Sequence, residues 1–314
     1  MIEPVALLKD LVRINTTNPP GEEEKLLLYL ERILQEHRIP YVYQKSAKGR
    51  GNLLAWQLAD QAEEAPLILM SHTDVVAAQA SQWKFPPFEA QEVDGYIYGR
   101  GTVDTKQLTA MELTAFLALK EKEIPLKRDV YFLATSDEES GSAYGLQWFL
   151  DHEITVGETT KTGRELFRGS DVISEGGGFP VVGGKREFYL CESGQKSCGT
   201  VEFTVKAKNA KGAFFTSEDG MERAMGLAED IGKQKLDGRV LDTVKQFEQK
   251  LAGVQLSPMM QKILTAMKQN SMTVTMITGK NVNEVTLVCD VRLLPGFGQK
   301  YLEEIAKYKD KALR

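Results

Sequence analysis

His72 and Asp74 are the first residues whose types and spacing could do chemistry. They follow the apolar run LILM at residues 67–70 and lie two positions apart, so in an extended segment their side chains point to the same side. The carboxylate could then join the imidazole at a metal ion or orient it from behind. For this pair alone, a histidine at a strand end beside a solvated aspartate is the simpler interpretation.

Asp104 is the second candidate. It ends the stretch GRGTVD, and a helical pattern begins directly after it, which places its carboxylate at the N-terminus of a helix. There it could cap the helix, or it could bridge two cations by giving one oxygen to each. The stretch also resembles half of a GxGxxG fingerprint, but Asp104 stands where the third glycine is required, so we discard dinucleotide binding.

Two further acidic stretches follow apolar runs. SDEESG places Glu138 and Glu139 after the run YFLA at residues 131–134. Adjacent side chains at a strand end diverge, so one can bind a metal while the other faces the attacking water. Metal-assisted hydrolysis needs this division between a cation and a proton-transferring carboxylate, although an acidic helix start is the alternative. ISEGGG then supplies Glu175, with glycines that allow close backbone approach to a ligand.

Four separate strand ends therefore each offer one hard ligand: His72, Asp104, Glu139 and Glu175. In α/β proteins, ligands bind beyond the carboxyl ends of the strands, where loops bring such side chains together. Imidazole combined with carboxylates suits Zn²⁺, with Co²⁺ or Mn²⁺ as possible substitutes. The sequence thus predicts a zinc site.

The elements that must position these residues alternate along the first part of the chain. We expect an α/β domain over residues 1–186, with a mixed, buried sheet flanked by helices. Helical patterns occupy 3–14, 21–37, 105–122 and 141–152, and short apolar runs lie at 41–44, 53–57, 67–71, 96–98 and 129–135.

From about residue 187 the pattern changes to βαββα. GTVEFTVKAK alternates as a strand, 218–235 is periodic as a helix, two strands and a last helix follow, and 236–271 is expected to be further helix. We therefore expect a second α+β domain at 187–314. Such folds usually close with one more strand, so this domain is expected to be incomplete and the chain to be cut short.

Composition excludes several kinds of partner. The formal charge is −5, from 39 Lys and Arg against 44 Asp and Glu, and no basic block predicts nucleic acid or anionic membrane binding. No segment approaches the roughly 18 apolar residues of a membrane span, and the N-terminus lacks a signal pattern, so we expect a cytoplasmic protein. Cys191, Cys198 and Cys289 predict neither a disulfide scaffold nor a thiolate metal site, and we interpret them as buried thiols.

The motifs SHTDVV, WxxxPF, GxIYGRGxxDxK, TSDEESGS and EGGG occur in this order. Together they resemble the zinc-dependent peptidase family of aminoacylase, carboxypeptidase G, acetylornithine deacetylase and succinyl-diaminopimelate desuccinylase, from the N-terminal helices to DVRLLPG near residue 296. The resemblance implies that His72, Asp104 and Glu175 hold one metal ion. Asp104 would bridge to a second ion, which also takes Glu139.

The same resemblance implies further roles. Asp74 would orient His72, and Glu138 would be the general base that takes a proton from the water and passes it to the leaving amine. The peptide bond Asp104–Thr105 would be cis. The βαββα segment would be the lid of the family, which often forms homodimers.

The sequence departs from the family pattern at two points. The second metal of the family takes a histidine after the lid, and His37 and His152 are expected at helix ends rather than in that role. The lid of the family carries a histidine that stabilises the oxyanion, where this chain has Ala213 or Phe214. Loss of such a donor costs about 100- to 1000-fold in turnover.

The resemblance therefore implies a hydrolase that cleaves an amide bond of a small peptide or N-acyl amino acid with a water activated by two zinc ions. The departures keep open a second hypothesis, an impaired or inactive relative or fragment that binds metal and dimerises. The identity of the substrate does not follow from the sequence.

Overall fold

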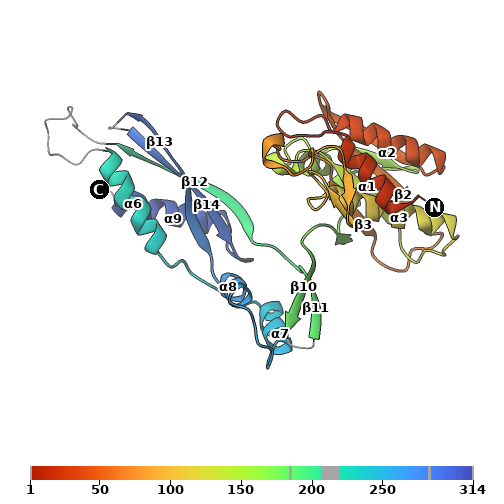
Figure 1. Ribbon diagram of the computed structural model, residues 1–314. Helices are drawn as coiled ribbons and strands as arrows, with labels where there is room; N and C mark the ends of the chain where they lie inside the picture. Colours follow the sequence, from red (N-terminus) through yellow and green to blue (C-terminus); the bar gives the residue numbers. More distant parts are fainter. Residues whose placement is uncertain (1, 184–185, 207–219, 282–283, 313–314) are drawn as a thin grey trace. The chain divides into compact units, whose positions relative to one another are not determined.

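The computed structural model describes residues 2–183, 186–206, 220–281 and 284–312. The chain divides into two compact units, Met1–Glu175 and Gly176–Arg314 (Figure 1). The expected boundary at residues 186 and 187 differs from this division. Within the described residues, every helix is too short or too polar to cross a membrane.

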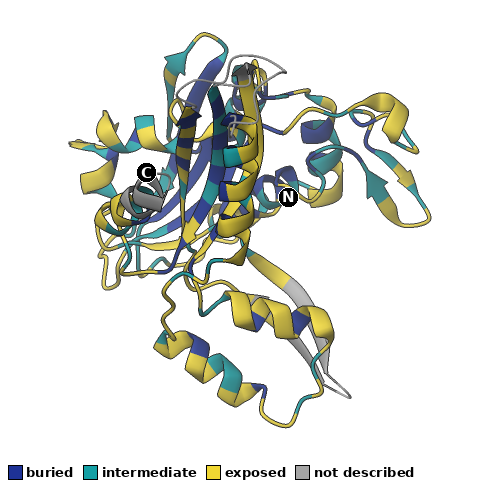
Figure 2. Ribbon diagram, turned by 90° about the vertical axis from the view of Figure 1, so that its left-hand side faces the viewer, coloured by how far each residue is buried: buried dark blue, intermediate teal, exposed yellow. Residues whose placement is uncertain are grey.

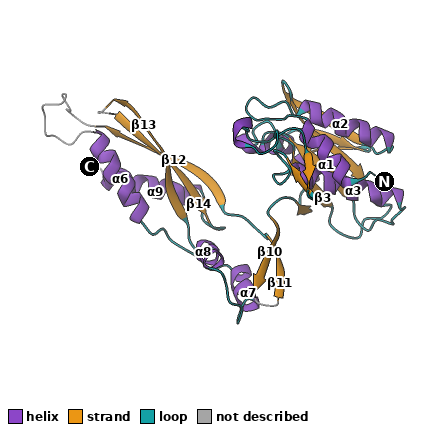
Figure 3. Cartoon of the chain, viewed as in Figure 1, coloured by secondary structure: helices purple, strands orange, loops and turns teal. Residues whose placement is uncertain are grey.

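The first unit contains one main sheet, two small hairpins and five α-helices among its described residues (Figure 3). In chain order its elements are α1 (Pro4–Arg13), α2 (Glu24–Glu36), β1 (Tyr41–Ala47), β2 (Arg50–Gln57), β3 (Leu67–His72), β4 (Gln91–Val93), β5 (Tyr96–Tyr98), α3 (Lys106–Glu121), β6 (Val130–Thr135), α4 (Leu146–Asp151), β7 (Glu153–Val156), β8 (Thr159–Thr162), α5 (Gly163–Leu166) and β9 (Asp171–Ile173).

The main sheet has the order β1-β2-β6-β3-β9 and is mixed, as expected. β1 pairs antiparallel with β2, and β2 pairs antiparallel with β6. β3 pairs in parallel with β6 on one side and with β9 on the other. Three neighbouring strands therefore end at the same edge of the sheet.

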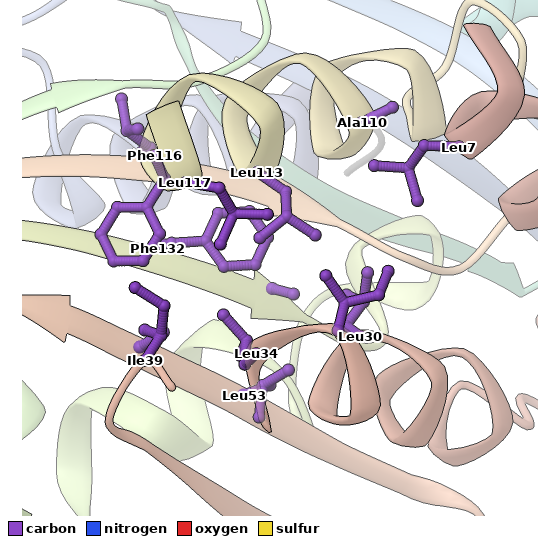
Figure 4. Close-up of a cluster of buried hydrophobic side chains, with 14 of the residues drawn as sticks. Leu7, Leu30, Leu34, Ile39, Leu53, Ala110, Leu113, Phe116, Leu117 and Phe132 are labelled. Atoms are coloured by element: carbon purple, nitrogen blue, oxygen red, sulfur yellow. The ribbon is translucent and has the colours of Figure 1, made fainter. Parts of the chain in front are cut away.

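Helices cover both faces of this sheet because its central strands are apolar on both sides. Along β6, Phe132 faces a core formed with α1, α2 and α3, whereas Tyr131 and Leu133 face a second core with α4 and β7. Figure 4 shows the first core, in which Phe116 and Leu113 of α3 lie over Phe132. The period of two along a strand produces this division.

Local signals explain where the helices begin and end. The carboxylate of Glu3 accepts hydrogen bonds from the first backbone N–H groups of α1, and Pro4 takes the first helical position, which needs no N–H donor. The helix expected over 141–152 is shorter than predicted, because Gly141 and Ser142 have positive φ angles and α4 begins only at Leu146.

The second unit has the expected βαββα order with two more helices inserted. Its elements are β10 (Gly177–Gly183), β11 (Arg186–Cys191), β12 (Ser197–Lys206), α6 (Gly220–Lys233), α7 (Asp242–Lys250), α8 (Pro258–Ala266), β13 (Ser271–Asn281), β14 (Glu284–Leu293) and α9 (Gln299–Ala312). The antiparallel sheet β12-β14-β13 packs against α6 and α9. The prediction of further helix between residues 236 and 271 is confirmed.

The core of the second unit lies on one face of this sheet. Alternate residues of β14, including Leu287, Cys289 and Val291, are fully buried, while α7 and α8 are mostly exposed (Figure 2). The interpretation of all three cysteines as buried is wrong for Cys191 and Cys198, which are exposed because they lie at the ends of their strands. Ala213 and Phe214 lie outside the described residues.

Candidate metal centre

The carboxyl ends of β6, β3 and β9 bring one imidazole and three carboxylates to one edge of the first unit. His72 is the last residue of β3, Glu138 and Glu139 follow β6 by three and four residues, and Glu175 follows β9 by two. Parallel pairing of β3 with both neighbours aligns these ends.

Three side chains converge on one point at this edge. The Nε2 atom of His72 lies 3.1 Å from an Asp104 carboxylate oxygen and 3.4 Å from a Glu175 carboxylate oxygen. One ligand atom from each of these residues lies within 4.8 Å of the other two. His72 is buried, whereas the carboxylates of Asp104 and Glu175 are exposed, so the group opens toward solvent.

The backbone fixes which imidazole nitrogen faces the acidic groups. The Nδ1–H of His72 donates to the main-chain carbonyl of Asp74 at 3.0 Å, and a carboxylate oxygen of Asp74 lies 3.4 Å from the same nitrogen. This contact turns Nε2 toward Asp104 and Glu175. An imidazole held through one nitrogen in this way is the usual arrangement of a metal-binding histidine.

The charges at this edge favour a cation. Burial disfavours the imidazolium form of His72, but hydrogen bonds and charge interactions with Asp74 and Glu175 outweigh burial and raise its pKa to about 11. The hydrogen bond from His72 lowers the pKa of Glu175. Carboxylates that hold a proton on an imidazole so firmly also favour a divalent cation at the same place.

Asp74 is fully buried, and it contacts other residues besides His72. Its carboxylate accepts hydrogen bonds from the backbone N–H groups of Glu138 and Glu139, both at 3.1 Å, and from the side-chain amide of Asn18 at 2.8 Å. Burial opposes ionisation, but the contacts with His72 and Asn18 prevail and lower the pKa of Asp74. Asp74 is therefore ionised and holds the segment that carries both glutamates.

Glu138 and Glu139 occupy a short 3₁₀ turn. A carboxylate oxygen of Glu138 lies 3.9 Å from the Nε2 atom of His72. Burial raises the pKa of Glu138, and the negative charge of Glu175 adds to this effect. Burial and the charge of Asp104 also raise the pKa of Glu139, which lies outside the group of three converging ligand atoms.

Asp104 reaches the site from the loop before α3. The peptide bond Asp104–Thr105 is cis, as the resemblance implies. Thr105, and not Asp104, occupies the N-cap position, so Asp104 is not a helix cap. Gly101 has a φ of +92°, and a Cβ atom there would lie 3.0 Å from Val75 and 3.1 Å from Lys106, so the loop requires glycine at this point.

Lys106 holds the same loop through hydrogen bonds of its side chain. It is fully buried, and its Nζ atom donates to the carbonyl of Leu11 at 3.0 Å and to that of Ile14 at 2.7 Å, at the end of α1. Burial lowers its pKa to about 7. The lysine thus ties the start of α3 to the end of α1.

The other two histidines lie at helix ends, as expected. His37 ends α2 and lies 3.2 Å from a carboxylate oxygen of Glu121. His152 ends α4, and its ring stacks on Trp148 with a centroid distance of 3.7 Å. His72 is the histidine at this site.

Sequence reasoning missed four buried polar residues next to the site: Asn18, Glu23, Arg50 and Asp137. Asn18 belongs to TTNPPG, in which the prolines and the glycine indicate only a break between two helices. The polar residues before the prolines were the available signal. Arg50 gives no such signal, since only the tertiary fold brings it to Asp137.

One imidazole nitrogen and two carboxylates, converging within 4.8 Å and open to solvent on one side, form a suitable donor set for a divalent transition-metal ion. Such a site leaves coordination positions open for water or substrate. This is a feature of catalytic rather than structural metal sites.

Comparison with known proteins gives relatives that share sequence. A protein of Staphylococcus epidermidis named probable succinyl-diaminopimelate desuccinylase is 34% identical over 149 residues, which cover 47% of this chain and 35% of that protein. An uncharacterized metallohydrolase of Methanocaldococcus jannaschii is 29% identical over 235 residues, which cover 70% of this chain and 53% of that protein. The chain thus spans about a third to a half of the length of these relatives.

Solved structures share the fold. The M20 family metallo-carboxypeptidase Sso-CP2 from Sulfolobus solfataricus has a TM-score of 0.67 and 21% identity, and the match covers 100% of this chain and 76% of that one. The family model described as Peptidase family M20/M25/M40 matches residues 68–283, which is more than half of the chain. The chain therefore belongs to peptidase family M20/M25/M40.

Proposed function

We propose that the chain is a zinc-dependent hydrolase that cleaves an amide bond of a small peptide or N-acyl amino acid. The convergence of the Nε2 atom of His72 with carboxylate oxygens of Asp104 and Glu175 carries this proposal. The related proteins support the reaction class, since one is named a probable desuccinylase and one a metallo-carboxypeptidase.

His72, Asp104 and Glu175 would hold the first zinc ion, and Asp104 would share a second one with Glu139. A divalent cation at such a site lowers the pKa of a water toward ~7 and polarises the carbonyl of the amide. The exposed carboxylate of Asp104 has two oxygens, of which one contacts His72. The other oxygen would be the one that Asp104 offers to the second cation.

Glu138 would transfer the proton. Its carboxylate lies at the site without belonging to the group of converging ligand atoms, and its backbone is held by Asp74. A raised pKa suits a base that accepts a proton from water and then gives it to the leaving amine. The neighbouring glutamate can then bind metal, which separates the two roles.

One observation favours a second function. The converging ligand atoms come from three residues, and Glu139 is not among them. Loss of the second cation, which Glu139 would hold, fits an impaired relative that keeps one metal ion. Under both hypotheses, the βαββα lid would form the contact between the two chains of a dimer.

The test is hydrolysis of a panel of dipeptides and N-acyl amino acids by the full chain with Zn²⁺. We expect Glu138→Gln to lose activity by about 100-fold or more while zinc binding is retained, because a positioned base contributes 10²–10⁴-fold. Glu158→Gln, at an exposed position, is the matched control. Equal rates for Glu138→Gln and the unmutated protein would remove Glu138 as the base, and a single bound zinc ion with no turnover would favour the second function.

A further inference from the structure

A buried polar network supports the acidic turn, by which we mean Asp137–Ser140. Asp137 begins the turn with a φ of +65°, a left-handed conformation that residues other than glycine rarely adopt. Its carboxylate accepts hydrogen bonds from Arg50 and from the backbone N–H of Tyr144, the latter at 3.0 Å. Its own N–H donates to Glu23 at 3.2 Å. Side chains from distant segments thus hold this conformation.

Asp74 holds the turn from the other side. The N–H of Glu138 donates to one carboxylate oxygen of Asp74, and the N–H of Glu139 donates to the other, each at 3.1 Å. These two bonds fix the direction in which the backbone presents both glutamates. The turn is therefore held between two carboxylates, those of Asp74 and Asp137.

Asn18 connects these two carboxylates. Its Nδ2 atom donates to Asp74 at 2.8 Å and to Asp137 at 3.0 Å, and its Oδ1 atom accepts from Arg50 at 2.7 Å. The guanidinium can only donate and the ionised carboxylates can only accept, so the orientation of the amide is fixed. Both hydrogens and the oxygen of the amide are used.

The charges in this network make a neutral donor necessary. Asp74, Asp137 and Asn18 are 0%, 3% and 3% exposed. Arg50 contacts Asp137 and Asn18, whereas the basic group beside Asp74 is His72, at 3.4 Å. Two buried carboxylates repel each other, and hydrogen-bond donors placed between them offset this repulsion. An oxygen in place of Nδ2 would turn a shared donor into a third acceptor.

The loop that carries Asn18 packs closely against the side chain of Arg50. Gly21 has a φ of +79°, and a Cβ atom there would lie 2.5 Å from the guanidinium of Arg50. The same guanidinium donates to the carbonyl of Pro20 at 2.7 Å. Asn18, Pro20 and Gly21 thus form one surface against Arg50.

We infer that Asn18 is a positioning residue for the metal centre: it holds Asp74 and Asp137 so that the acidic turn presents Glu138 and Glu139 to the site of His72. Asn18 itself contacts no converging ligand atom. The role assigned to the two glutamates rests on the proposed function.

The test compares Asn18→Asp with Asn15→Asp in the full chain. Asn15 lies in the same loop, is exposed, and uses only its Oδ1 atom, which accepts from Thr17. Aspartate keeps that oxygen, so Asn15→Asp is a matched control. The first readout is hydrogen exchange of the metal-free protein over residues 137–142. The second is titration with Co²⁺, followed by its visible absorption.

In Asn18→Asp we expect amide exchange in the acidic turn to be at least 10-fold faster, and the second Co²⁺ to bind at least 10-fold more weakly. Binding of the first Co²⁺ should change by less than 3-fold, because Asp104 and Glu175 lie outside the network. The third ligand, His72, is held by the main-chain carbonyl of Asp74, whereas Asn18 contacts only the carboxylate of that residue. Asn15→Asp should match the unmutated protein in both readouts.

Unchanged exchange in Asn18→Asp would overturn the inference, and so would faster exchange with unchanged binding of both ions. If the unmutated protein bound no Co²⁺, the proposed function would fail, and the exchange difference would still decide whether Asn18 holds the turn. Asn18→Ser, which removes the shared donor without adding charge, repeats the comparison if Asn18→Asp does not fold. Exchange of β3 and β6 in the same experiment reports folding.

Discussion

His72 shows how much of the candidate site depends on single contacts. Its Nδ1 atom is occupied by the carbonyl of Asp74, and only Nε2 faces Asp104 and Glu175. A residue two positions along the chain therefore decides which nitrogen is available. The spacing of two residues predicts that Asp74 lies on the same side as His72 and can contact its ring. The shorter contact is made by the main-chain carbonyl of Asp74 and not by its carboxylate.

Buried residues beside the site could not be predicted in the same way. The sequence signals for His72, Glu138 and Glu175 are polar groups that follow apolar runs. Arg50 begins a strand whose other residues predict only burial, and Glu112 lies within a regular helical pattern. Their partners are distant in sequence, so only the folded chain reveals their roles.

Glu112 leads to a prediction for the pH dependence of stability. It lies on α3 and is 4% exposed; burial raises its pKa to about 8 from 4.5, and Ser71 and the backbone of Met70 offset part of this effect. The folded protein then keeps a proton that the unfolded chain releases, so this contribution to stability is present below pH 4.5 and is lost as the pH rises to 8.

We therefore expect the unmutated protein to lose stability relative to Glu112→Gln as the pH rises from 5 to 8, by up to about 1.4 kcal/mol per pH unit. Urea denaturation at several pH values measures this difference. Glu36→Gln, at an exposed position of α2, should show no such trend. A constant difference between Glu112→Gln and the unmutated protein across this range would contradict the raised pKa.

At the scale of elements, the sheet depends on the contact between α3 and β6. Phe132 is fully buried and its ring centroid lies 6.0 Å from that of Phe116. We expect Phe132→Ala to destabilise the first unit by about 3–5 kcal/mol, since it removes a large side chain that its neighbours cannot replace. Thermal and urea denaturation check this value.

Met111→Ala is the control for this prediction. Met111 lies on the same helix and is 59% exposed, so its replacement should change stability by less than about 0.5 kcal/mol. If both variants had the same small effect, the core between α3 and β6 would not carry the stability assigned to it.

Strong apolar periodicity made the long helices predictable from the sequence, whereas short strands without this periodicity were not predicted. The helices α1, α2, α3 and α6 lie where the apolar pattern predicts them. The hairpin β7–β8 did not emerge from the sequence, because its strands of four residues carry mostly exposed side chains and TTKT has no apolar alternation. Its stability comes from pairing and from packing of Ile154 and Val156 into the second core.

At the level of the whole molecule, the change in pattern predicts two domains with a boundary at residues 186 and 187, whereas the two compact units divide between Glu175 and Gly176. The hairpin β10–β11 lies between Glu175 and the βαββα segment and belongs to the second unit. Contacts in the folded chain, rather than the local sequence, therefore define the boundary.

The second unit leads to a prediction about assembly. Among the described strands of its main sheet, β13 lies at one edge. Two of its apolar residues, Met276 and Ile277, are 56% and 46% exposed to solvent. Apolar edge strands tend to pair with another chain. We predict a homodimer formed through β13, and Met276→Lys should shift it toward monomer.

Light scattering at several protein concentrations measures this shift. Leu58→Lys, which replaces an exposed apolar residue of the first unit, should leave the dimer intact. A chain that is monomeric without any mutation, or a dimer that tolerates Met276→Lys, would contradict this mode of assembly.

The metal centre is tested most directly by calorimetry of Zn²⁺ binding to the full chain and to two histidine variants. We predict that His72→Ala weakens binding at least 100-fold, because it removes the imidazole that would be the nitrogen ligand at the converging site. His152→Ala, which removes an imidazole stacked on Trp148, should bind as the unmutated protein does. Equal affinity of His72→Ala and the unmutated protein would contradict the metal centre on which the proposed function depends.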